Sequence, residues 1–312
     1  MELKHIFGPV PSRRLGISAG IDLIPYKTCS LNCIYCECGK TTNLTTKRKE
    51  YVSISAVIEE LKKFLKPGPD LDYITFSGSG EPTLHLNPGK IIDFIKNNYP
   101  QYKVALLTNG TLFYNNNDLI NDIKKLDLIV PSLDAVSKKT FEKINRPVSS
   151  LRPENIISGL IQLRNNYSGK IWLEIFIIAG INDTDSELKL IKKAINQIKP
   201  DKIQLNTLDR PGTEEWVKPV SRKKLKSISD YLGENTEIIA KFESKKTNIK
   251  DFRKELKTNI LKTLKRRPCT SEDLAHILGV NVNEINKLIK YLIENNKIQI
   301  KTEKRGKFYY LN

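Results

Sequence analysis

Long apolar runs are missing from this sequence of 312 residues, and no internal repeat or low-complexity segment stands out. The N-terminal stretch MELKHIFGPVPSRRLG contains no apolar segment of the length that a signal peptide or a membrane-spanning helix needs. We therefore expect a cytoplasmic protein, in a compartment where thiols stay reduced.

Acidic residues are few relative to basic ones. Asp and Glu number 35 against 52 Lys and Arg, which gives a formal net charge of +17. This excess predicts attraction to an anionic partner, such as nucleic acid, a phosphorylated metabolite or an acidic protein. The alternative explanation is a genome that favours Lys, Ile and Asn, which would raise the net charge of the surface even if the protein bound no anionic partner. Residues 245–312 hold 17 basic and 7 acidic side chains, 17 − 7 = +10, so over half of the excess lies there.

Cysteine is scarce as well, yet four of the five cysteines lie in KTCSLNCIYCECGK, residues 27–40. In a reducing compartment, such a tight group more often binds metal or performs redox chemistry than forms disulfides. Cys29, Cys33 and Cys36 follow the spacing C-x3-C-x2-C. Three thiolates at this spacing can hold a [4Fe-4S] cluster, and the fourth iron then stays open for a substrate or cofactor.

Zinc is the alternative occupant of this cysteine group. A structural zinc site needs four protein ligands, and Cys38 would be the fourth, with His5 or His85 as more distant substitutes. If zinc is not bound, Cys38 is a spare ligand, a hydrogen donor or an ordinary loop residue. The isolated Cys269 is expected to be a small packing residue.

Strand and helix patterns alternate along most of the chain, which predicts an α/β fold with a parallel sheet and crossover helices. Apolar strands are expected within residues 15–25, 72–82, 103–112, 127–135, 170–183 and 201–212. Amphipathic helices are expected within residues 52–66, 88–100, 117–126, 139–147, 152–167 and 185–198.

A second unit is expected after this series, so we divide the chain into residues 1–244 and 245–312. Its patterns are a basic helix, a short helix, a turn, a longer helix and a hairpin. That order is typical of a winged helix-turn-helix domain. The expected segments are 248–268, 270–279, 281–296 and 297–312.

Two motifs resemble those of the radical S-adenosylmethionine (SAM) superfamily. CSLNCIYC has the cysteine spacing of that superfamily with an aromatic residue, Tyr35, just before the third cysteine, and SGSGEPTL resembles its glycine-rich turn after the second strand. The resemblance covers roughly residues 15 to 210 and implies a partial (β/α)6 barrel. It also implies a [4Fe-4S] cluster on Cys29, Cys33 and Cys36, with SAM chelating the open iron. One electron then cleaves SAM to methionine and a 5′-deoxyadenosyl radical, which abstracts hydrogen from the substrate.

The resemblance also implies where SAM binds, because the carboxyl ends of barrel strands carry the chemistry in such folds. For any single polar residue at a strand end, capping of a turn explains its presence at least as well as contact with SAM. The prediction therefore rests on the whole series of strand-end residues, which occurs in register with the cysteines. The implied contacts are Tyr35, Ser79, Gly80, Glu81, Asn109, Ser132, Asp134 and Asn206. Arg13 and Arg14 precede the first strand and are candidates for an anionic substrate or the SAM carboxylate.

In its details the sequence resembles a family of iron-sulfur oxidoreductase-like proteins related to the wyosine-forming tRNA enzymes and, more distantly, to glycyl-radical-enzyme activases. No cysteine precedes Cys29, which departs from the two-cluster architecture of the wyosine enzymes. The implied function is radical chemistry on an unidentified substrate, with RNA ahead of DNA as partner of the C-terminal unit. The implied electron donor is a reductase or a protein of the flavodoxin or ferredoxin type. The alternatives are an iron-sulfur redox sensor that binds DNA and a radical activase of a protein.

Overall fold

The computed structural model describes most of the chain, but not its N-terminal end or the segment around the expected domain boundary at residue 245. The described residues are 3–12, 14–208, 212–240 and 256–311, with the exception of 262, 265–267, 279, 281 and 304–305. Arg13 therefore lies outside the described residues, as do the first eight residues of the basic helix expected at 248–268.

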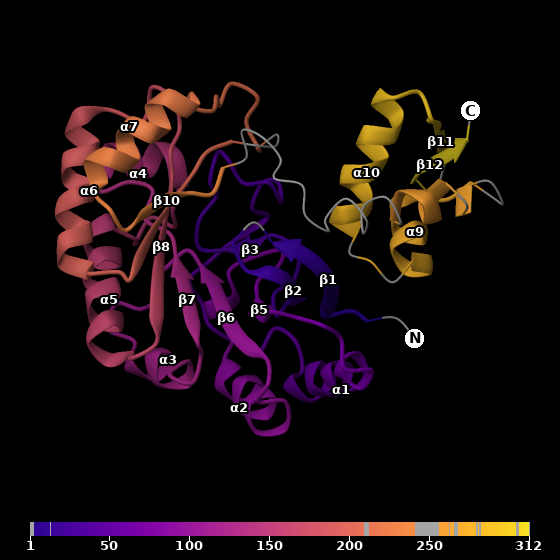
Figure 1. Cartoon of the computed structure of the whole chain (residues 1–312), viewed down its shortest axis with the longest axis horizontal. Helices are drawn as coiled ribbons and strands as arrows, with labels where there is room; N and C mark the ends of the chain where they lie inside the picture. Colours follow the sequence, from indigo (N-terminus) through magenta and orange to yellow (C-terminus); the bar gives the residue numbers. More distant parts are fainter. Residues whose placement is uncertain are drawn as a thin grey trace.

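One large sheet organises the first part of the chain, in the strand order β1-β2-β5-β6-β7-β8-β9-β10 (Figure 1). Each neighbouring pair from β2 to β10 is parallel, and only β1 joins the sheet antiparallel, through β2. The strands are β1 (Ile6–Ser12), β2 (Gly16–Ile21), β5 (Tyr73–Phe76), β6 (Lys103–Thr108), β7 (Leu128–Pro131), β8 (Lys170–Phe176), β9 (Lys202–Asn206) and β10 (Thr236–Ile238).

Helices connect the parallel strands and lie along the outer side of the sheet (Figure 1). They are α1 (Ile54–Leu65), α2 (Pro88–Asn98), α3 (Asn117–Asp122), α4 (Lys138–Asn145), α5 (Pro153–Asn166), α6 (Asp185–Ile198) and α7 (Arg222–Leu232). The parallel α/β fold expected from the alternating patterns is confirmed.

Helical spacing of apolar residues explains how these helices dock on the sheet. In α1 the side chains of Val57, Leu61 and Leu65 recur at every fourth position and are buried. In α6 the Thr184 hydroxyl accepts a hydrogen bond from the backbone N–H of Glu187 and so caps the helix. The apolar stripe thus orients α1 on the sheet, and the Thr184 cap sets where α6 begins.

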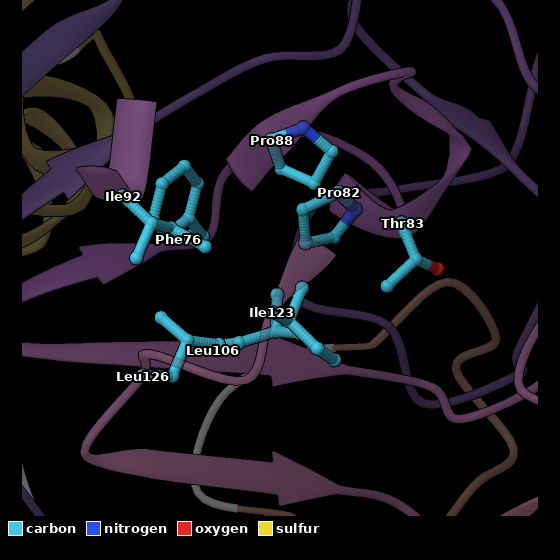
Figure 2. Close-up of a pocket in the computed structure, with 8 residues that line it drawn as sticks. All are labelled: Phe76, Pro82, Thr83, Pro88, Ile92, Leu106, Ile123 and Leu126. Atoms are coloured by element: carbon cyan, nitrogen blue, oxygen red, sulfur yellow. The ribbon is translucent and has the colours of Figure 1, made fainter. Parts of the chain in front are cut away.

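The interior beneath the turn that follows β5 is filled with apolar side chains (Figure 2). Phe76 from β5, Ile92 from α2 and Leu106 from β6 meet there, with Pro82 and Pro88 above them. The small void among them is bordered almost wholly by carbon, so it is part of the packed core. Its role is to fix the turn at residues 77–81 above the sheet.

Several elements were not expected from the sequence. These are β1, the short parallel pair β3 (Thr28–Cys29) and β4 (Asn43–Leu44), the 3₁₀ turn η1 (Pro82–Leu84), α7 and β10. The pair β3 and β4 is too short to leave a periodic signal, and it forms because backbone groups on either side of the cysteine loop bond to each other.

The C-terminal part has an apolar core of its own. Residues 256–261 and 263–264 are helical, and α9 (Ser271–Leu278), α10 (Val282–Glu294) and the antiparallel pair β11 (Ile298–Glu303) and β12 (Gly306–Leu311) follow. This is the order of elements expected from the sequence. Cys269 is 1% exposed within this core, which confirms its packing role. Among the helices that the structure describes, none combines the length and apolar character required to span a bilayer.

Candidate active site at the carboxyl ends of the strands

The cysteine loop is anchored by backbone hydrogen bonds at its first cysteine and between its second and third. Cys29 ends β3, which pairs with β4, and its carbonyl accepts a hydrogen bond from Thr45 N at 2.9 Å. Farther along the loop, Ile34 N donates to the carbonyl of Ile144 at 2.9 Å. The loop is therefore held to β4 at its start and to α4 near its middle.

Each of the three motif cysteines accepts a hydrogen bond at sulfur from a different part of the chain. Lys27 Nζ donates to Cys36 Sγ at 3.0 Å. Asn109 Nδ2, just after β6, donates to Cys29 Sγ at 3.4 Å, and Asn145 Nδ2, at the end of α4, donates to Cys33 Sγ at 3.4 Å. Such donors stabilise thiolate sulfur and tune the potential of a metal that it binds.

The thiols also affect one another electrostatically. Burial and the Glu81 carboxylate raise the pKa of Cys29 to about 11. Burial and Asp134 raise the pKa of Cys33 well above its usual value, and the neighbouring thiols add to both shifts. A hydrogen bond from Cys38, helped by the Lys27 ammonium and opposed by burial, lowers the pKa of Cys36 to about 5. The pKa of Cys38 moves up for the same reason.

The described residues contain no preformed site for a single metal ion. In the described part of the chain, no three His, Cys, Asp or Glu side chains lie close enough to share one ion. His85 cannot complete a zinc site, because its ring nitrogens meet the backbone carbonyls of Leu86 and Val52. A [4Fe-4S] cluster takes one thiolate per iron and so suits thiols that are near one another without sharing an ion.

The glycine-rich turn after β5 lies directly against the cysteine loop. Ser79 donates from its N–H and its hydroxyl to Asp22 Oδ2, at 3.0 and 2.8 Å. Its carbonyl accepts from Lys27 N at 3.0 Å. A Cβ at Gly80 would collide with the carbonyl oxygen of Thr28, so only glycine permits this approach. The turn and the loop are therefore one rigid unit.

Glu81 is buried under this turn and braces the neighbouring strand end. Its Oε1 accepts from Thr83 N, from Thr83 Oγ1 and from Thr108 Oγ1, and its Oε2 accepts from Asn109 N at 2.7 Å. Burial raises its pKa in spite of these donors. The side chain of Glu81 thus orients Asn109, which in turn contacts Cys29.

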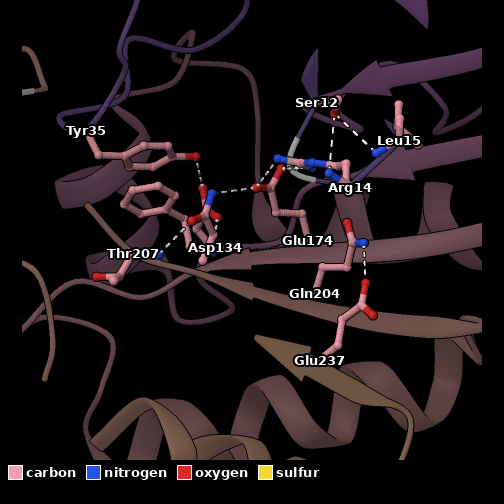
Figure 3. Close-up of polar contacts among 11 residues, drawn as sticks. Ser12, Arg14, Leu15, Tyr35, Asp134, Glu174, Gln204, Thr207 and Glu237 are labelled. Carbon is pink, nitrogen blue, oxygen red and sulfur yellow. Dashed lines mark hydrogen bonds and ion pairs between the residues drawn. The ribbon is translucent and has the colours of Figure 1, made fainter. Parts of the chain in front are cut away.

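A second polar group joins Tyr35 to the end of β7 (Figure 3). The Tyr35 ring stacks on Phe176 with 3.9 Å between centroids, and its hydroxyl donates to Asp134 Oδ2 at 2.5 Å. Asp134 also accepts from Asn145 Nδ2 at 2.8 Å and from Phe176 N at 3.0 Å. Burial raises the pKa of Asp134 to about 6. The aromatic residue before the third cysteine is therefore fixed by the strand ends.

A pocket with about 20 Å³ of space for water-sized molecules lies between these groups and is partly open to solvent. Four of the predicted SAM contacts line it: Tyr35, Asn109, Ser132 and Asp134. Asn145 lines it too, and its Oδ1 is buried without a hydrogen-bond partner among the described residues. Because Nδ2 already faces the acceptors Cys33 and Asp134, the amide orientation is fixed and an acceptor is left for a ligand.

Asn206, another of the predicted contacts, does not line this pocket and is held by a carboxylate. Its Nδ2 donates to Glu174 Oε1 at 3.0 Å. Glu174 accepts two hydrogen bonds of 2.8 Å from the Arg14 guanidinium. Although burial lowers the pKa of Arg14, the Glu174 carboxylate more than offsets this and leaves the pKa raised. Arg14 is thus engaged by a partner and is not free for an anionic ligand.

Sequence reasoning missed the residues that support the site. These are Asp22, Lys27, Asn145 and Glu174. Lys27 stands two residues before the first cysteine, and its position was the one available signal, since a lysine beside thiolates lowers their pKa. The other three lie far from their partners in sequence.

The sequence of this chain is similar to those of known proteins. Residues 23–195 match the model of the Radical SAM superfamily. A protein of Brachyspira hyodysenteriae named GTPase Obg is 38% identical over 304 residues, covering 96% of this chain and 44% of that protein. A UPF0026 protein of Methanocaldococcus jannaschii is 33% identical, covering 98% of this chain and 95% of that protein. The chain thus spans less than half of the first relative and nearly all of the second.

Solved structures share the fold at low sequence identity. A radical SAM methyltransferase from Sphaerobacter thermophilus superposes with a TM-score of 0.55 at 14% identity, covering 72% of this chain and 67% of that chain. The structure of TYW1 with a lysine-pyruvate adduct bound gives a TM-score of 0.51 at 17% identity, covering 70% of this chain and 74% of that chain. At these identities the similarity shows the α/β fold with its mostly parallel sheet. It does not show which substrate this chain acts on.

Proposed function

This chain belongs to the radical SAM superfamily of enzymes and to the UPF0026 family, and we propose that its strand-end site generates a 5′-deoxyadenosyl radical that acts on an RNA substrate. Members of the superfamily bind a [4Fe-4S] cluster and SAM. In this proposal Cys29, Cys33 and Cys36 are the ligands of the cluster. The large sheet and its helices form the partial (β/α)6 barrel of the family.

The observation that carries the proposal is the donor set around the three sulfurs. An ammonium and two amide groups, from Lys27, Asn109 and Asn145, point at the three motif cysteines. They would compensate the negative charge of bound thiolates. When bound, the reduced cluster supplies the electron that cleaves SAM to methionine and the 5′-deoxyadenosyl radical. Cys38 instead lies with its Sγ 3.8 Å from the Gly78 carbonyl, and we keep it out of the ligand set.

The strand ends around the pocket beside Cys33 are our candidate site for SAM, since the pocket itself, at about 20 Å³, is much smaller than that ligand. Tyr35, Asn109, Ser132 and Asp134 line it. The buried Asn145 Oδ1 would accept a hydrogen bond from a hydroxyl or ammonium group of the ligand. Ser79, Gly80 and Glu81 shape the neighbouring turn, and Glu81 acts through Asn109 rather than by direct contact. Asn206 belongs with Glu174 in the support of the sheet.

The C-terminal unit, taken as residues 245–312, is our candidate for the RNA-binding part. Its three helices and hairpin have the order of a winged helix-turn-helix domain. Its charge is uneven: residues 245–267 carry 10 basic and 2 acidic side chains, 10 − 2 = +8, whereas residues 268–312 carry 7 and 5, 7 − 5 = +2. On α10, Lys287 and Lys290 are paired with Glu284 and Glu294. Electrostatic attraction to phosphates therefore rests mainly on residues before 268.

Anaerobic reconstitution tests the proposed chemistry. The wild type should contain iron and sulfide in equal amounts and should form 5′-deoxyadenosine from SAM with dithionite. Cys29→Ala, Cys33→Ala and Cys36→Ala should each lose the visible absorption and this activity, whereas Cys38→Ala, the matched control, should keep both. Zinc without sulfide, or a cluster that binds SAM and never cleaves it, would overturn the proposal; the second result would favour a redox sensor.

A further inference from the structure

Lys27 is a buried lysine at the start of the cysteine loop, and it is only 3% exposed. Among the described residues its Nζ has one hydrogen-bond partner, Cys36 Sγ at 3.0 Å, and no carboxylate pairs with it. The titratable groups that act on it are the thiols of Cys36, Cys38 and Cys29. A buried ammonium is costly unless an anion compensates its charge. For Lys27 that anion has to be sulfur.

The backbone of Lys27 has a conformation that lysine rarely adopts. Its φ of 54° lies in the left-handed region, which glycine and asparagine occupy more readily. Lys27 N donates to the Ser79 carbonyl at 3.0 Å. The Lys27 carbonyl accepts from Thr42 N at 3.0 Å and from Asn43 N at 3.1 Å. These bonds use backbone atoms only, so the loop itself does not need a lysine here, and glycine would suit its conformation better.

Lys27 also differs from the other two donors to the motif cysteines. Asn109 and Asn145 donate through neutral amide groups, each at 3.4 Å from its sulfur. Lys27 brings a full positive charge to 3.0 Å from Cys36 Sγ. Away from bulk water, such a charge acts much more strongly on a nearby charge than it would at the surface. Of the three donors, Lys27 is therefore the one that would respond most to a change in the charge held by the cysteines.

We propose that Lys27 raises the reduction potential of the cluster by stabilising its reduced form through the sulfur of Cys36. The proposal rests on the proposed function, because Lys27 has this role only if the motif cysteines hold the cluster. On reduction, one electron passes from a reductant such as dithionite to the oxidised cluster, and no bond to Lys27 forms or breaks. The cluster with its thiolates then becomes more negative by one unit. A fixed positive charge favours that more negative state.

The test compares three substitutions of Lys27 with a matched control in the full-length chain. Lys27→Met removes the charge and keeps an apolar stem, whereas Lys27→Gly removes the whole side chain and suits the left-handed backbone. Lys27→Arg keeps a positive charge. The control, Lys40→Met, removes the same charge from the same loop at a side chain that is 67% exposed, where water screens it. Iron and sulfide analysis first establishes that each variant has assembled the cluster.

The first readout is the midpoint potential of the reconstituted cluster without SAM, from a redox titration followed by electron paramagnetic resonance. At a fixed potential, Lys27→Met and Lys27→Gly should lower the ratio of reduced to oxidised cluster about tenfold or more. For a one-electron couple this corresponds to a midpoint about 59 mV more negative. Lys27→Arg and Lys40→Met should stay within about threefold of the wild-type ratio.

The second readout is urea unfolding of the cluster-free chain, which contains no metal. Lys27→Met and Lys27→Gly should unfold at the same urea concentration as the wild type or at a higher one. The reason is that both remove a buried charge, and Lys27→Gly also relieves the left-handed backbone. A residue that only supports the loop would show the opposite result.

The outcomes separate this role of Lys27 from the proposed function. Unchanged potentials in Lys27→Met and Lys27→Gly, or an equal shift in Lys40→Met, would overturn the proposal for Lys27 alone. Clearly lower stability of both cluster-free Lys27 variants, or their failure to assemble a cluster that the wild type assembles, would show a structural role and overturn it as well. Absence of the cluster from the wild type would overturn the proposed function and this proposal together, and it would be detected before any potential is measured.

Discussion

The ion pair between Arg14 and Glu174 gives the sharpest prediction about stability. It joins the turn after β1 to the middle of β8, across 160 residues of sequence, through two hydrogen bonds of 2.8 Å. The two side chains are 13% and 16% exposed. Removal of one member leaves the other charge buried without compensation, which typically costs about 3–5 kcal/mol.

We therefore expect Arg14→Met to lower the free energy of unfolding by about 3–5 kcal/mol, although Asn206 still donates to the Glu174 carboxylate. The double variant Arg14→Met/Glu174→Met removes both charges and should recover at least half of that loss. Urea unfolding of the cluster-free protein, followed by far-ultraviolet circular dichroism, measures both values. A double-mutant cycle then isolates the coupling energy.

A surface ion pair with a similar distance between the charged atoms is the control. Lys226 and Asp230 on α7 lie 2.7 Å apart with side chains 67% and 60% exposed, so Lys226→Met should cost less than about 1 kcal/mol. The reasoning would be refuted if Arg14→Met also cost less than about 1 kcal/mol and the double variant showed simple additivity.

Three further predictions concern the site and the C-terminal unit. Gly80→Val should prevent cluster assembly as well as SAM binding, because the new Cβ meets the Thr28 carbonyl next to Cys29; iron analysis that found a full cluster would contradict this. The raised pKa of Asp134, about 6, means that its protonation favours the folded state, so the stability it contributes is complete below the unfolded pKa of 3.8 and is lost as pH rises through about 6. The free energy of unfolding of the cluster-free wild type, relative to that of Asp134→Asn, should therefore rise by roughly 1 kcal/mol when the pH is lowered from 8 to 5. Equal differences at the two pH values would disprove this prediction. A chain that ends at residue 244 should cleave SAM normally but bind tRNA more weakly and with less salt dependence; unchanged binding in a filter or gel-shift assay would remove RNA from the role of the C-terminal unit.

Local patterns were sufficient to predict most of the fold. The stripe of Val57, Leu61 and Leu65 predicted α1, because a helix has 3.6 residues per turn and residues four positions apart therefore lie on the same face. The glycine turn near Gly80 and the cysteine spacing were visible for the same reason, since each is contained in a few consecutive residues. The prediction ended where the signal was too short, as in β3 and β4, or where the element forms an edge, as in β1 and β10.

The partners of the site residues could not be predicted in this way. Asn145 contacts Cys33 across 112 positions, and Arg14 contacts Glu174 across 160. One sequence contains no trace of such pairs, because any strand end could have supplied the amide or the carboxylate. For the same reason the four hydrogen bonds that Glu81 accepts, one of them from Asn109 N, could not be foreseen.

The distribution of buried carboxylates supports a functional reading of the strand ends. Burial raises the pKa of Asp22, Glu81 and Asp134, and each of them accepts hydrogen bonds from the loops that hold the site. An apolar side chain would fill the same space without the cost of desolvation, so a fold under selection for stability alone has little reason to keep three such groups. Each of these carboxylates fixes a loop that an apolar residue could not orient, because it aligns donors at defined angles. The sheet therefore gives up some stability at one edge in order to hold the cysteine loop, the glycine turn and the Tyr35 ring in one arrangement.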